Sequence, residues 1–68
     1  MNNMWINVND EMPEKWKHEN DELVNYLVYM PDYGVDIASY FKPADRWVCM
    51  GLPVTVTHWM PLPEPPKR

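Results

Sequence analysis

Apolar and polar residues alternate with a period of two along most of the chain, which is typical of β-strands rather than of helices. In residues 23–30 apolar side chains occupy both alternating faces, so we expect this strand in the centre of a sheet with both faces covered. Residues 35–42 alternate more cleanly. The tetrapeptide Pro-Asp-Tyr-Gly at residues 31–34 favours a tight turn, so the two strands are predicted to form a β-hairpin.

Three shorter strands are predicted at residues 5–8, 46–50 and 54–60. The Gly-Leu-Pro sequence at residues 51–53 is expected to end the second of these. The pattern as a whole therefore predicts an all-β fold, either a five-stranded antiparallel meander or a small barrel.

The chain has the length of one domain. Its 68 residues can bury only a modest core, to which four Trp and four Tyr contribute large side chains. We expect residues 1–62 to form a single β domain, and one helical turn over residues 14–19 is compatible with Pro13 before it. Residues 63–68 are rich in proline, which cannot donate to a β-ladder, and are predicted to form an extended tail.

Charge is distributed unevenly along the chain, whose net charge is −4. Residues 1–38 hold eight acidic and two basic residues, whereas residues 39–68 hold two acidic and four basic residues. A net acidic domain repels phosphate backbones, so direct nucleic-acid binding is not expected. The acidic cluster in residues 10–22 is interpreted either as a solvated loop or as an electrostatic patch for a basic partner protein.

Aromatic side chains accompany this acidic cluster, and aromatic residues of this kind are enriched at the centres of protein contact surfaces. Trp16 lies within the cluster, and Tyr33 at the predicted hairpin turn is expected to flank it. The candidate protein-binding residues are Asp10, Glu11, Glu14, Trp16, Glu19, Asp21, Glu22 and Tyr33.

Catalytic and metal-binding signatures are missing from the sequence. Two glycines cannot form a phosphate-binding Gly-rich loop, and Ser39, the only serine, falls inside a predicted strand. His18 and His58 are far apart in the sequence, and His58 is expected to make a structural hydrogen bond in its strand. Cys49 is the only cysteine, and we interpret it as a small buried hydrophobe. We therefore expect no catalytic residue, no metal site and no cofactor, and hence a protein that is not an enzyme.

Both ends of the chain carry specific motifs. Residues 5–13 read WINVNDEMP, and residues 57–66 read THWMPLPEPP. Together they resemble the domain-of-unknown-function family 551, which is found in phages and prophages. Leu-Val-Tyr at residues 27–29 and Trp47 are similar to the middle strand and a Trp-bearing strand of that family. The link at residues 14–22 is longer and more charged than the family's.

The resemblance implies a phage or prophage origin and no particular biochemical activity. We expect the strand with Trp5 and the strand with Trp59 to pair and close the sheet, which would remove its exposed edges. The motif residues are expected to define the fold rather than to act chemically; they are Trp5, Pro13, Trp47, His58, Trp59, Pro61 and Pro63.

The expected function is that of a small non-enzymatic phage or prophage accessory protein that binds a host or phage protein. A host defence system that handles nucleic acid is a suitable target for inhibition, since its basic groove attracts acidic patches. Two alternatives remain: a β-barrel that binds a small molecule, and a structural phage component that assembles as a homo-oligomer. The sequence shows no leader and no apolar run of about 18 residues, so we expect a location in the bacterial host cytoplasm and no membrane contact.

Overall fold

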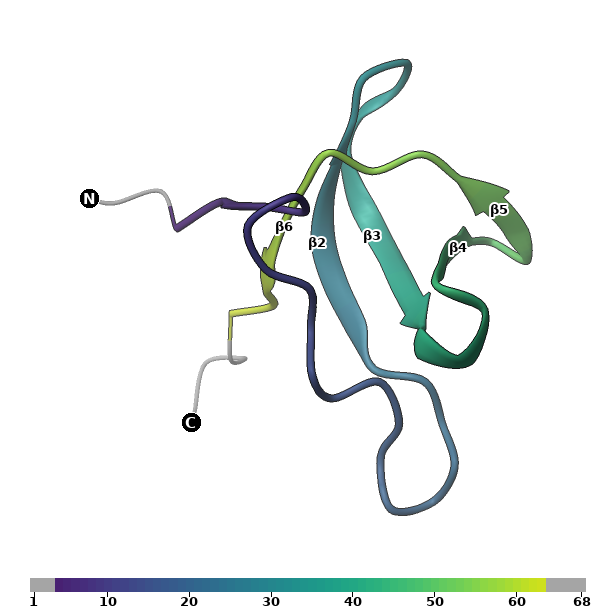
Figure 1. The fold of residues 1–68 in the computed structure, drawn as a ribbon. Helices are drawn as coiled ribbons and strands as arrows, with labels where there is room; N and C mark the ends of the chain where they lie inside the picture. The colour runs from purple at the N-terminus through teal and green to yellow at the C-terminus, as the bar shows by residue number, and fades with distance from the viewer. Residues whose placement is uncertain (1–3, 64–68) are drawn as a thin grey trace, which may run out of the picture.

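The computed structural model describes residues 4–63, which form a single antiparallel sheet and one 3-10 turn (Figure 1). The strand order in the sheet is β1-β6-β2-β3-β4-β5. The all-β class predicted from the alternation is confirmed. The elements are β1 (Ile6–Asn7), β2 (Asn25–Met30), β3 (Gly34–Phe41), the 3-10 turn η1 (Lys42–Ala44), β4 (Arg46–Cys49), β5 (Leu52–Val54) and β6 (His58–Pro61).

The arrangement of the strands differs from both predicted architectures. Residues 4–63 contain six strands rather than five, and the sheet is open, with β1 and β5 at its edges. The order is not that of a pure meander, because the last strand lies between the first and the second. The predicted pairing of the two Trp-bearing ends is present, since Ile6 lies opposite Trp59. This pairing extends the sheet by one strand and does not close it.

The additional strand arises at residues 50–54. Gly-Leu-Pro at residues 51–53 was expected to end a strand, but Met50 and Gly51 instead form a two-residue turn with φ of 54° and 81°. Positive φ at both positions is the geometry of a type I′ hairpin, which brings Cys49 opposite Leu52 and starts β5. The predicted strand at residues 54–60 is consequently divided, because the chain leaves the β5 edge and crosses to the other side of the sheet before β6 begins.

The core lies on one face of the sheet. It consists of eight side chains that are at most 7% exposed: Tyr26, Val28, Met30, Ala38, Tyr40, Trp47, Val56 and Trp59. Aromatic rings meet edge to face at its centre, where the Tyr26 and Trp59 centroids are 5.1 Å apart with an interplanar angle of 77°. Large rings thus fill much of the small core.

Residues 9–24, which we call the cover segment, lie over this core. Pro13 is buried, and Met12, Trp16 and Val24 pack against the core. The core also holds the backbone of the cover segment, because the Trp59 Nε1–H donates to the Glu11 carbonyl at 2.9 Å. The sheet and this irregular segment therefore form the two layers between which the core is buried.

The helical turn considered for residues 14–19 does not form. The Lys15 carbonyl accepts a hydrogen bond from the Tyr26 hydroxyl at 2.5 Å, and the Trp16 carbonyl accepts one from the Val24 amide at 3.0 Å. Both carbonyls would have to accept from amides four residues later in an α-helix. The chain instead doubles back in an irregular hairpin at residues 16–24, with Lys17 opposite Leu23.

The second face of β2 is not buried. The strand is central, as expected, with β6 on one side and β3 on the other. The prediction that both of its faces are covered is wrong for the part of the chain that the structure describes, because Tyr29 is 41% exposed and Leu27 is only half-buried. We call the apolar side chains on this side of the sheet the outer face; they are Leu27, Tyr29, Val35, Ile37, Phe41, Val48, Pro53 and Met60, and Trp16 packs on Phe41.

Both edge strands are poor templates for a further strand. β1 has two residues and β5 has three. The middle residue of β5 is Pro53, which lacks an N–H and so offers no hydrogen-bond donor. Short edges interrupted by proline are a common way in which natural sheets resist edge-to-edge association. Pro61 is the last residue of β6, and most of the predicted tail, residues 64–68, lies outside the described residues.

Candidate protein-binding surface

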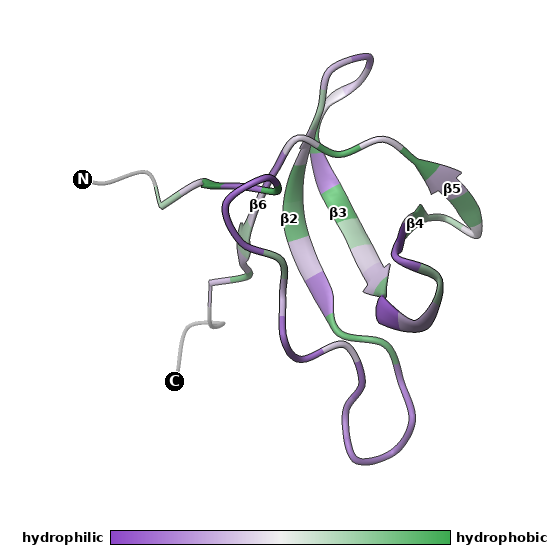
Figure 2. Cartoon of the chain, in the orientation of Figure 1, coloured by the Kyte–Doolittle hydropathy of each residue, from purple (hydrophilic) through white to green (hydrophobic). Residues whose placement is uncertain are grey.

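All six acidic side chains of the cover segment are exposed. They are Asp10, Glu11, Glu14, Glu19, Asp21 and Glu22. The cover segment turns its apolar side chains and several carbonyl groups toward the core, which leaves its charged side chains on the solvent side. Figure 2 shows hydrophilic colour along residues 17–22 of the cover segment and hydrophobic stretches in β2 and β3. The backbone that carries the carboxylates is thereby attached to the core.

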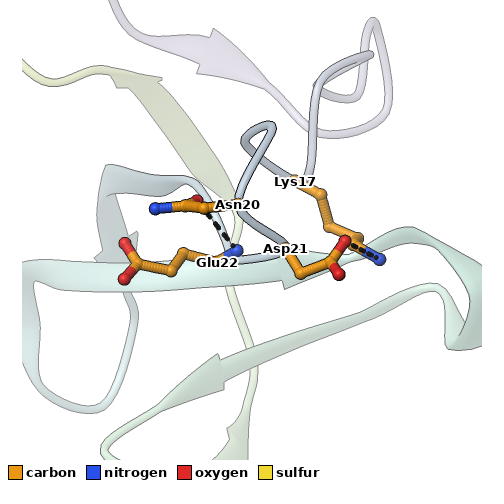
Figure 3. Close-up of polar contacts among 4 residues, drawn as sticks. All are labelled: Lys17, Asn20, Asp21 and Glu22. Carbon is orange, nitrogen blue, oxygen red and sulfur yellow. Dashed lines mark hydrogen bonds and ion pairs between the residues drawn. The ribbon is translucent and has the colours of Figure 1, made fainter.

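The hairpin at residues 16–24, here called the acidic hairpin, has a defined turn (Figure 3). The Asp21 amide donates to the His18 carbonyl at 3.0 Å, and Asp21 itself has a φ of 67°. The Glu22 amide donates to Asn20 Oδ1 at 3.3 Å. A turn followed by one left-handed residue is a common hairpin connection, and aspartate is one of the residue types that tolerate that conformation.

One carboxylate of the acidic hairpin is in an ion pair. Lys17 Nζ lies 3.0 Å from Asp21 Oδ1, with the Asp21 side chain 82% and the Lys17 side chain 38% exposed, and this is the sole ion pair among residues 4–63. Exposed pairs of this kind are screened and contribute little to stability. The remaining acidic side chains of the cover segment have no cationic partner within that range of the chain, so a basic surface can approach them directly.

The Trp16 side chain is only partly accessible to a binding partner. Its ring packs edge to face on Phe41 with the centroids 5.2 Å apart, and Lys17 Nζ lies 5.1 Å from the ring centroid. The side chain is half-buried and packs against the core. Trp16 thus joins the acidic hairpin to the end of β3 and offers only part of its ring to a partner.

Tyr33 does not lie beside the acidic hairpin. It is 79% exposed at the tip of the β2–β3 hairpin, at the opposite end of β2 (Figure 1). The six residues of β2 separate the two sites by roughly 20 Å. The sequence-based expectation that Tyr33 flanks the acidic cluster is therefore not met by the geometry.

A cleft of about 460 Å³ lies next to Tyr33. It runs between the β2–β3 tip and β5, and Tyr33, Asp32, Met50 and Leu52 are among its lining residues. The volume falls within the range of small-molecule sites. It is not the interior of a barrel, because the sheet is open and the core is filled by its own side chains.

The motif residues fall into three classes of burial. Trp47 and Trp59 are each 6% exposed in the core, and Pro13 is a buried residue of the cover segment. His58 is half-buried, with Nδ1 2.9 Å from the Thr57 hydroxyl oxygen. Trp5 is half-buried, whereas Pro61 and Pro63 are exposed.

The outer face was not recognised as a surface from the sequence. Val35 and Ile37 are 59% and 48% exposed and lie beside Tyr29 and Leu27 in the register of the hairpin. The signal was present, because residues 23–30 are apolar on both faces, but it was interpreted as burial within the chain. An apolar sheet face of this kind is a candidate interaction surface.

The other side chains that could bind a metal ion or react are not clustered in the described residues. Residues 4–63 contain no group of three or more His, Cys, Asp or Glu placed to hold a metal ion. Cys49 is half-buried rather than buried, and its thiol donates to the Ile37 carbonyl at 3.4 Å. No helix within the described range is long and apolar enough to span a membrane.

The family of the chain follows from its sequence. A family model described as "Protein of unknown function (DUF551)" matches residues 4–67. The chain belongs to this family. The match includes both terminal motifs, so the resemblance expected from them is confirmed, and in the structure these motifs supply the paired strands β1 and β6. No curated protein and no solved structure matches the chain.

Proposed function

We propose that this protein is a non-enzymatic accessory factor that binds a basic surface of another protein through its cover segment. The observation that carries the proposal is the set of six exposed carboxylates on a backbone fixed to the core, with one ion pair among them in the described part of the chain. The partner is a host or phage protein. A groove that normally holds nucleic acid has the fitting chemistry, since it is lined by cationic side chains.

The charge distribution favours this mode of binding. Of the net charge of −4, the cover segment alone contributes six acidic and two basic residues. A concentrated acidic patch raises the association rate with a basic surface and disfavours acidic partners, including nucleic acid itself. The protein would thus compete with nucleic acid for the groove in a phage or prophage setting.

The attachment of the cover segment reduces the entropic cost of binding. The Trp59 bond to Glu11 and the Tyr26 bond to Lys15 hold the segment at two points, and the turn at Asp21 holds the hairpin. Carboxylates on a preordered backbone lose less freedom on binding than those of a disordered acidic tail.

The proposal is tested by capture from nuclease-treated bacterial host lysate at low salt, followed by affinity measurements with the recovered protein. Glu14→Gln combined with Glu19→Gln should weaken binding about tenfold or more and reduce its salt dependence. Asp32→Asn combined with Asp36→Asn is the matched control, because it removes the same charge outside the cover segment and should change affinity little. No captured protein above background, or equal effects of the two variants, would refute the proposal.

The cleft at Tyr33 supports a second candidate, the binding of a small molecule. A ligand that binds the folded state raises the melting temperature by mass action. Thermal melts with a metabolite panel test this candidate. A compound that stabilises the wild type and not Tyr33→Ala would support it, and no shift with any compound would count against it.

A further inference from the structure

The cleft at Tyr33 opens on the core side of the sheet, between two hairpins. Asp36, one of its lining residues, lies opposite the buried Val28 in the register of β2 and β3. Val54, another lining residue, lies opposite the buried Trp47 in the register of β4 and β5. Directly opposed residues share a face of a sheet, so both side chains lie on the core side. Among residues 4–63 the cover segment contributes nothing to the lining, and the cleft is therefore separate from the acidic hairpin.

The lining of the cleft combines apolar side chains with carboxylates. On the side of β4 and β5 it includes Met50 and Leu52, which are 93% and 67% exposed. On the side of β2 and β3 it includes Asp32, Tyr33 and Asp36, all of which are exposed. A concave site with apolar walls and a few polar groups is typical of small-molecule binding, in which the apolar walls would bury the body of a ligand.

The two carboxylates of the cleft have no cationic partner in the described part of the chain. Asp32 and Asp36 line the cleft, whereas no Lys, Arg or His of residues 4–63 does. The one ion pair in that range joins Lys17 and Asp21. Asp36 Oδ1 accepts a hydrogen bond from the Ile37 amide at 2.7 Å, which orients this carboxylate and leaves its other oxygen available to a ligand. The cleft thus carries two negative charges for a ligand to neutralise.

We propose that this cleft binds a small organic cation, a molecule with an ammonium or guanidinium group on an apolar body. The proposal rests on the second candidate function, the binding of a small molecule, and specifies the class of ligand. The two carboxylates attract a cation and repel an anion, so a nucleotide or another phosphate is disfavoured. The exposed ring of Tyr33 adds a face on which a cation can lie.

The exposure of the charged groups limits the selectivity and the affinity. Ion pairs at exposed carboxylates are weak and are screened by salt. Two such pairs and one cation–π contact should favour a cation over a neutral molecule of the same shape by at least about fivefold. A ligand of about a dozen non-hydrogen atoms should bind with a dissociation constant in roughly the millimolar range.

NMR titrations of the isotope-labelled full chain test the proposal with a matched set of probes. Tryptamine carries an ammonium group on an indole body, tryptophol replaces this group by a hydroxyl, and indole-3-propionate replaces it by a carboxylate. Methylamine has the ammonium group without the apolar body. Tryptamine should shift the amides of the β2–β3 tip and of β5, and it should bind at least about fivefold more tightly than tryptophol. Indole-3-propionate and methylamine should bind more weakly than tryptamine.

Two paired variants separate the cleft from the general acidity of the protein. Asp32→Asn combined with Asp36→Asn should reduce the affinity for tryptamine to that for tryptophol, and asparagine retains the oxygen that accepts from the Ile37 amide. Glu14→Gln combined with Glu19→Gln is the matched control, because it removes the same charge from the cover segment and should leave tryptamine binding unchanged. Circular dichroism will show that each variant is folded.

Three results would overturn the proposal. The first is equal affinity for tryptamine, tryptophol and indole-3-propionate, which would leave the small-molecule candidate standing without a preference for cations. The second is the absence of amide shifts at the cleft with about 10 mM tryptamine. The third is equal weakening of tryptamine binding by the two paired variants. Asp32→Asn combined with Asp36→Asn should still bind a captured partner protein, so this proposal and that of the cover segment can fail separately.

Discussion

The turn between β4 and β5 contains a residue whose replacement should stabilise the protein. Met50 has a φ of 54° in a two-residue turn where both positions require positive φ. A left-handed conformation costs an ordinary L-residue roughly 1–2 kcal/mol, and asparagine pays less because its side chain can bond locally. Met50 is 93% exposed, so its replacement removes almost no contact. Met50→Asn should therefore raise the free energy of unfolding by about 0.5–1 kcal/mol.

Thermal and urea denaturation measure this effect. For a domain of this size, about 1 kcal/mol corresponds to a shift of roughly 4–8 °C in the melting temperature, so we expect an increase of about 2–8 °C. Met50→Ala is the control, because it removes the same side chain without relieving the backbone and should give no increase. An unchanged or lower melting temperature for Met50→Asn, or an equal gain with Met50→Ala, would refute the assignment of a type I′ turn.

Two hydrogen bonds and one glycine turn give three further predictions about stability. Burial and the hydrogen bond to Asp45 raise the pKa of Tyr40 from 10.0 to about 12, so the folded state keeps a proton that the unfolded state releases. The resulting stability is complete below pH 10 and should fall by about 2 kcal/mol between pH 10 and 12 in urea titrations, and by less in Tyr40→Phe. Trp59→Phe should cost about 2 kcal/mol in urea denaturation, because the Glu11 carbonyl loses its donor; a cost below about 0.5 kcal/mol would contradict the role of this bond. Gly34→Ala should cost about 1–2 kcal/mol in the same assay, because Gly34 has a φ of 91°; no loss would show that the turn adapts.

The hairpin of β2 and β3 was predictable because its signals are local. Alternation over residues 23–30 and 35–42 defined the two strands, and the turn residues between them defined their connection. The pairing of β1 with β6 was predictable only through the terminal motifs. The β4–β5 turn was missed because Met50 is not a residue type that marks a left-handed position.

The candidate site was predicted less completely, because its decisive contacts are not local. The backbone of the cover segment is held by Tyr26 and Trp59 through carbonyl groups, whose partners no residue pattern specifies. The acidic residues were identified by composition, whereas the distance to Tyr33 depends on the direction of β2. The burial of the outer face was predicted wrongly. A strand with apolar residues on both faces can be covered by a second layer of the same chain or by another molecule, and the sequence does not distinguish the two.

The position of β6 affects when the protein can fold during its synthesis. Among the strands of residues 4–63, β6 is made last, yet it lies between β1 and β2 and contributes Trp59 to the core. A nascent chain that has not yet released these residues from the ribosome lacks the strand that joins its first two, and the Glu11 carbonyl lacks its donor. The sheet can therefore be completed only after residues 58–61 have left the ribosome, and a truncated chain that stops before residue 58 should be degraded rather than accumulate as a folded fragment.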